Sequence, residues 1–128
     1  MEAKHNFTAA SNVFKLALYD NSASFTAATT AYTSSNEISG TNYTAKGQFL
    51  TSVTPTTSST TALTDFADEV FSNVTISGVR GALIYNEAAT SDPSVCVLDF
   101  GSDKSASSGD FTIVFPTPDA SNAIIRIA

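Results

Sequence analysis

The chain has 128 residues, which is enough for one domain, and it carries a formal net charge of -6 with only six Lys and Arg residues. Nucleic-acid binding needs clustered cations that displace phosphate counterions, so this acidic balance argues against DNA or RNA as a partner. Charged residues make up 14% of the chain, and Ser and Thr, together more than a quarter of it, must supply much of the polar surface. This composition favours strands and turns.

The first residues do not read as a signal peptide, because Glu2 follows the initial Met and no apolar stretch comes after it. No apolar run approaches the roughly 20 residues that a membrane helix requires. We therefore expect synthesis in a cytoplasm and no membrane partner. Cys96 is the only cysteine, so an internal disulfide is excluded. We divide the chain into a polar N-terminal arm, residues 1–11, and a single β domain, residues 12–128.

The first half of the chain shows alternating apolar residues with a period of two, which predicts strands. Residues 12–19 place Phe14, Leu16 and Leu18 on one face. A second run covers residues 49–53, and Pro55 is predicted to end this strand or to place it at a sheet edge. A third covers residues 60–67. Residues 22–35 are interpreted as a long loop with at most one helical turn, because their Thr content opposes a helix.

The second half continues the pattern, with strands predicted at residues 70–77, 79–85, 94–100, 110–115 and 122–128. Gly78 is predicted to separate the first two of these strands. Residues 79–85 and 94–100 are more continuously apolar, which predicts central strands buried on both faces. Residues 65–71 also fit one face of a short helix, but a strand is favoured. Eight candidate strands indicate an all-β fold, either a two-layer antiparallel β-sandwich or a jelly-roll-like barrel.

Catalytic chemistry is not indicated by any motif. His5 is the only histidine and lies in a polar terminal stretch, and Cys96 lies in an apolar run, where cysteine usually acts as a small hydrophobe. Asp99, Asp103 and Asp110 offer oxygen ligands for calcium but match no EF-hand spacing, so turn formation is the favoured interpretation. We therefore expect no enzyme activity, no catalytic residue, no metal and no cofactor.

Several segments resemble small structural virion proteins of tailed bacteriophages. The resemblance rests on residues 14–19, 30–33, 36–45, 81–86, 98–104 and 109–112, and thus spans most of the chain. Asn42 and Lys46 depart from the pattern, which has Gly at both positions. Asn tolerates a positive φ better than other non-Gly residues, so the turn is expected to survive. The resemblance implies a place in the virion and transfers no catalytic residues.

Aromatic residues are favoured anchors at protein interfaces. The predicted partner-binding residues are His5, Phe7, Phe25, Tyr32 and Tyr43, with the alternative that these side chains complete the core. The leading hypothesis is a capsid decoration or cement protein that bridges major capsid subunits, as a homo-oligomer on the particle. Two alternatives stay open: a tail- or fibre-associated component, and a carbohydrate-binding β-sandwich adhesin, which the absence of Trp weakens.

Overall fold

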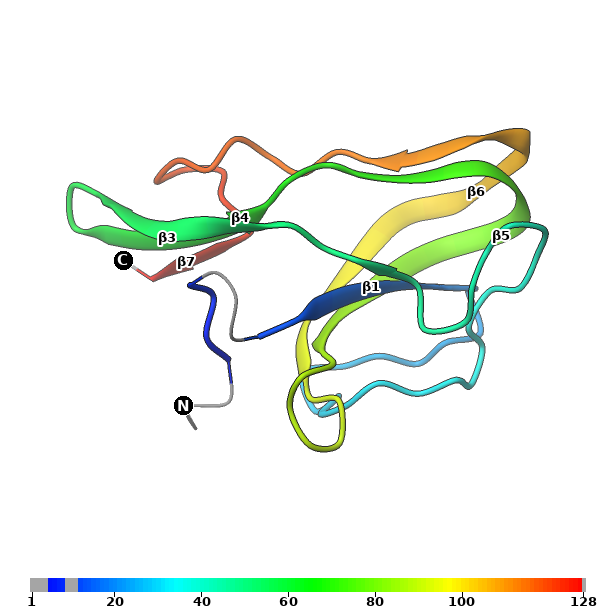
Figure 1. Ribbon diagram of the computed structural model, residues 1–128, viewed down its shortest axis with the longest axis horizontal. Helices are drawn as coiled ribbons and strands as arrows, with labels where there is room; N and C mark the ends of the chain where they lie inside the picture. The colour runs from blue at the N-terminus through cyan, green and yellow to red at the C-terminus, as the bar shows by residue number, and fades with distance from the viewer. Residues whose placement is uncertain (1–4, 9–11, 128) are drawn as a thin grey trace.

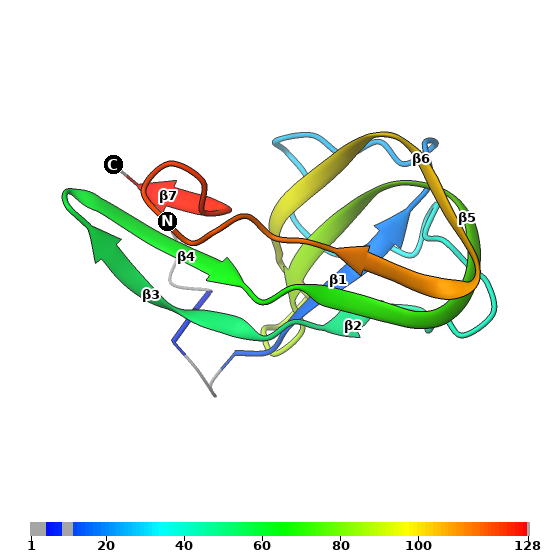
Figure 2. The same ribbon diagram turned by 90° about the horizontal axis from the view of Figure 1, so that it is seen from above.

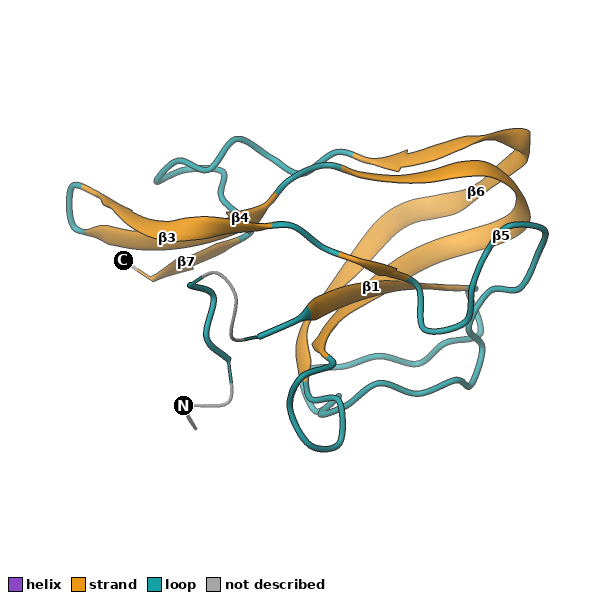
Figure 3. Ribbon diagram, in the orientation of Figure 1, coloured by secondary structure: helices purple, strands orange, loops and turns teal. Residues whose placement is uncertain are grey.

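The computed structural model describes residues 5–8 and 12–127, and Figures 1 and 3 show that this part of the chain is all-β with no helix. The described residues form seven strands: β1 (Phe14–Tyr19), β2 (Gln48–Phe49), β3 (Ser52–Ser58), β4 (Thr61–Phe66), β5 (Glu69–Asn86), β6 (Ser94–Ile113) and β7 (Ile125–Ile127). They build two antiparallel sheets, with strand orders β2-β1-β5-β6 and β3-β4-β7. The predicted β-sandwich is confirmed, whereas the alternative of a closed barrel is wrong.

The four-stranded sheet has β1 and β5 at its centre. β1 pairs with β5 from Phe14↔Asn86 to Tyr19↔Gly81, and it pairs with β2 through Lys15↔Phe49. Both faces of this centre are covered, so the end of β5, from Ala82 onward, is fully buried, as its continuous apolar run predicted.

The β5–β6 hairpin is much longer than expected and bends back over itself near its middle (Figure 1). Gly78 was predicted to end a strand, but it lies within β5 at φ 69°, and Gly101 lies within β6 at φ 75°. The pairing shifts register five times along the hairpin. β-bulges bend a strand without ending its pairing, which explains why four predicted strands merge into two.

The bend lets one hairpin contribute to both sides of the core. In β5, Phe71 and Ile76 lie before the bend and Ile84 lies after it. All three belong to one buried cluster with Phe14 of β1 and Phe66 of β4. The predicted central position of residues 94–100 is wrong, because β6 is an edge strand and Val97 is 40% exposed. An apolar run alone does not distinguish an edge strand from a central one.

The three-stranded sheet projects beyond the rest of the molecule, as the view from above in Figure 2 shows. We call it the wing. β4 lies at its centre, paired with β3 through Thr57↔Ala62 and with β7 through Ala62↔Ile127. Pro55 lies in the edge strand β3, where the register shifts between Val53 and Thr56. The predicted edge position of this proline is confirmed, since proline cannot donate a ladder hydrogen bond.

Residues 20–47 form a long loop without a helix. Its first part covers the outer face of the four-stranded sheet with Phe25 and Tyr32, and its later part runs beside β1, where the Ile38 N–H donates a hydrogen bond to the Leu18 carbonyl. Isolated bridges fasten it at Tyr19↔Glu37, Ala31↔Pro93 and Thr41↔Thr75. Asn42 and Lys46, which stand where the phage pattern has Gly, adopt φ values of 61° and 75°. The turns therefore keep the left-handed conformation that the Gly pattern implied.

Candidate contact surface

The N-terminal segment with His5 and Phe7 lies against the domain. The Phe7 ring stacks on Phe14 at a centroid distance of 4.8 Å, and it meets the edge of Phe66 at 6.4 Å. His5 Nδ1 lies 3.4 Å from the side-chain nitrogen Nδ2 of the buried Asn86. Residues 1–4 and 9–11 of the predicted arm lie outside the described residues. In the part that is described, the segment completes the aromatic core at the base of the wing.

The other three predicted contact residues also pack against aromatic residues of the same chain. The Phe25 ring meets Tyr19 edge to face at 4.6 Å, Tyr32 lies 4.9 Å from the Tyr85 ring, and Tyr43 stacks on a core phenylalanine. Phe25 and Tyr32 cover a second small buried cluster on the outer face of the sheet. The structure therefore places these aromatics in intramolecular packing, and their contact with a partner stays a prediction.

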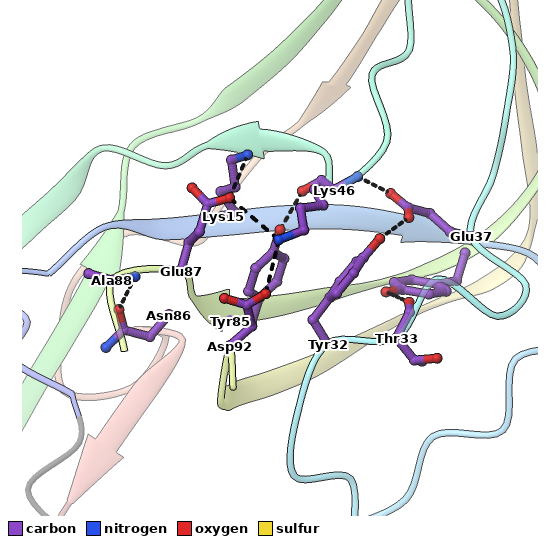
Figure 4. Close-up of polar contacts among 11 residues, drawn as sticks. Lys15, Tyr32, Thr33, Glu37, Lys46, Tyr85, Asn86, Glu87, Ala88 and Asp92 are labelled. Carbon is purple, nitrogen blue, oxygen red and sulfur yellow. Dashed lines mark hydrogen bonds and ion pairs between the residues drawn. The ribbon is translucent and has the colours of Figure 1, made fainter. Parts of the chain in front are cut away.

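Glu37 is the polar centre of this outer face (Figure 4). Its carboxylate accepts hydrogen bonds from the Tyr32 hydroxyl at 2.5 Å, the Tyr43 hydroxyl at 2.8 Å and the Lys46 backbone N–H at 2.7 Å. Tyr43 also accepts a bond from the Leu18 N–H, which joins the network to β1. Both tyrosines were predicted contact residues, whereas the glutamate that orients them was not predicted from the sequence.

Lysine side chains extend the network toward β1 and β5. The Lys46 ammonium lies 3.1 Å from Asp92 and 3.9 Å from Glu87, which in turn pairs with Lys15 at 3.1 Å. Tyr85 donates a hydrogen bond to the Lys46 carbonyl at 2.7 Å. Lys46 thus connects the end of the long loop to Glu87 and Asp92, which follow β5.

Replacing Glu37 by alanine is expected to destabilise the protein by about 2–4 kcal/mol, because two tyrosine hydroxyls and one backbone N–H lose a charged acceptor together. Chemical unfolding followed by circular dichroism measures this change. Glu87→Ala is the matched control, since it removes a carboxylate that forms ion pairs with two lysine side chains. Equal destabilisation by the two substitutions would contradict the central role of Glu37.

An apolar groove runs along one side of the wing. It has a volume of about 360 Å³, and its lining includes Phe7 together with Pro55, Ala62, Thr64, Ile125 and Ile127. Ala62 and Ile127 are paired neighbours on one face of the sheet, and Ile127 is 56% exposed. No charged residue lines the groove within the part of the chain that the structure describes. A strand was predicted here, but nothing in the sequence indicated that its apolar face stays partly uncovered.

β7 adds an open edge to this groove. Ile125 and Ile127 pair with β4 on one side, and no described strand pairs with the other side. The unpaired N–H and C=O groups of an edge strand can bind an extended segment of another chain. The groove and this edge together form the candidate contact surface.

The acidic residues considered for calcium binding have other partners. Asp99 and Asp103 contact Arg80, whereas Asp110 accepts a hydrogen bond from the Asn73 N–H. Over residues 5–8 and 12–127, no group of three or more His, Cys, Asp or Glu side chains could hold a metal ion. Cys96 is partly buried, and this burial raises the pKa of its thiol to about 11, so the thiolate is disfavoured at neutral pH.

Comparison with known proteins finds no matching family model, no matching curated protein and no matching solved structure. Within the described ranges, no helix is long and apolar enough to cross a membrane.

Proposed function

We propose that this chain is a structural protein of a tailed-phage virion that decorates the capsid and binds across neighbouring major capsid subunits. The observation that carries the proposal is the uncharged groove of the wing, with the open edge of β7 beside it. The resemblance of the sequence to small virion proteins is the reason for proposing a phage particle as the place of binding. The groove supplies a surface suited to protein contact, since the buried centre of an interface is depleted of charge.

The proposed partner is an extended apolar segment of the major capsid protein. Such a segment would add as a strand along β7, with its backbone bonded to the open edge and its side chains over Ile125 and Ile127. A decoration protein that binds only the assembled shell stabilises that shell by mass action. On the particle we expect symmetry-related copies of the chain around local axes.

Particles made without this protein test the proposal. We expect them to lose their DNA at a lower temperature than complete particles, and an electron cryomicroscopy map of complete heads should show the wing on the outer shell. Unchanged thermal stability combined with absence from purified heads would refute the proposal. Recovery in tail fractions would favour the tail- or fibre-associated alternative.

Ile127→Asp tests the groove itself. A carboxylate buried without a partner in an apolar interface costs roughly 3 kcal/mol or more, so binding to particles made without this protein should weaken by about 100-fold. Because Ile127 is 56% exposed, the free protein should keep its stability. Phe49→Asp is the matched control: Phe49 is 60% exposed but lies on β2, in the other sheet. Full binding by Ile127→Asp in a sedimentation assay would exclude the groove as the contact surface.

A further inference from the structure

A cleft opens on the outer face of the four-stranded sheet, beside the long loop and away from the wing. It has a volume of about 540 Å³, within the range of small-molecule sites. Its position follows from the strand register, because Tyr19 of β1 pairs with Gly81 of β5, which pairs with Asp99 of β6. Paired residues share one face of a sheet, so the cleft lies across three strands with a glycine in the middle row.

Gly81 keeps the floor of the cleft as bare backbone. A Cβ atom at this position would lie 2.4 Å from the Leu98 carbonyl oxygen, so the neighbouring strand leaves no room for a side chain. Tyr19 and Asp99 therefore face each other across a row without a central side chain.

One wall of the cleft is apolar. Phe25 packs edge to face against Tyr19, whose hydroxyl is held by a 2.6 Å hydrogen bond to the Thr33 carbonyl. Val97, which is 40% exposed, continues the apolar surface on β6. The orientation of the Phe25 ring is thus set by a tyrosine that is itself fixed, and no new ordering of this wall is needed on binding.

Four further lining side chains are planar and polar. Asp20 and Asn21 come from the turn after β1, while Arg80 and Asp99 come from the β5–β6 hairpin. The Arg80 guanidinium is already balanced, because it lies 3.2 Å from Asp99 and 3.7 Å from Asp103. A free anion would meet these carboxylates, and a purely apolar ligand would remove water from four polar side chains.

We propose that this cleft binds a neutral saccharide. A sugar ring presents C–H groups on one face and hydroxyls around its rim. The C–H face suits the Phe25 wall, and the hydroxyls suit Asp20, Asn21 and Asp99. The proposal agrees with the carbohydrate-binding interpretation of the sequence, but it does not depend on how the chain is attached to a virion, since the cleft and the wing groove have no lining residue in common.

The test uses the full chain on an array of neutral oligosaccharides (maltohexaose, cellohexaose, chitohexaose and a galactan), with sialyllactose and heparin as charged probes. We expect binding to at least one neutral probe, confirmed by calorimetry, and none to the charged probes. Phe25→Ala should weaken that binding by about tenfold. Asn21→Ala, at an exposed position, should weaken it without altering the thermal unfolding temperature.

Phe49→Ala is the matched control and should bind normally, because it removes an exposed aromatic ring from the same sheet outside the cleft. The proposal is overturned by any of three results: no neutral probe bound at about 10 mM, binding that survives both cleft variants, or binding confined to the charged probes. Because Asn21→Ala leaves the fold intact, loss of folding in Phe25→Ala would not obscure the result.

Discussion

Gly47→Ala is expected to destabilise the protein by about 3–5 kcal/mol, a large fraction of the stability of a domain this size. Gly47 has a φ of 71°, which any L side chain adopts at a cost. In addition, a Cβ atom would lie 1.8 Å from the Leu16 carbonyl oxygen and 2.8 Å from the Ala17 Cα atom. These are backbone atoms of the central strand β1, so the chain leading into β2 would have to move away from the sheet.

Gly78→Ala provides a matched control for this experiment. Gly78 has nearly the same φ, 69°, but nothing lies within 4 Å of the Cβ position. This substitution should cost only the backbone term, about 1–2 kcal/mol. Guanidinium unfolding of both variants therefore separates the steric contact from the strained φ. Equal losses of stability would show that the contact with β1 relaxes freely.

Alkaline unfolding is the second large effect that we expect. Burial raises the pKa of all four tyrosines, Tyr19, Tyr32, Tyr43 and Tyr85, and the nearby Glu37 carboxylate raises each of them further. Their ordinary pKa is about 10. The folded protein thus keeps protons that the unfolded chain releases above this pH.

The sign of the effect follows from proton linkage. Where the native state binds more protons than the unfolded state, stability falls as pH rises. The stabilisation is fully present below pH about 10, and up to four tyrosines then contribute to its loss as pH increases further. We expect cooperative unfolding above pH 10 by circular dichroism. Phenolate absorbance near 295 nm should appear in the same transition.

Two measurements check this interpretation. In concentrated guanidinium the tyrosines should titrate near pH 10, because the unfolded chain exposes them. Tyr32→Phe should reduce the phenolate signal of the transition by one group in four. Phenolate formation near pH 10 in a protein that stays folded would show that the four hydroxyls are accessible to water in the native state.

Part of the fold was accessible from the sequence because its signals are local. The alternation around Leu16 predicted β1, the continuous apolar run predicted the buried end of β5, and Pro55 predicted an edge. Each prediction depends on neighbours within a few residues of the chain. The aromatic contact candidates were also identified by residue type, but their spacing did not decide between contact with a partner and packing in the core.

The sequence by itself thus determined the all-β class, the positions of most strands and the long loop at residues 22–35. Only the tertiary structure decided that Gly78 bends a strand without ending it, that Cys96 lies in an edge strand, and that Glu37 joins tyrosines from the long loop. The physical reason is that a period of two shows which residues share a face but not which strands pair. The wing groove and the cleft over Gly81 lie between segments distant in the chain, so both depend on that pairing.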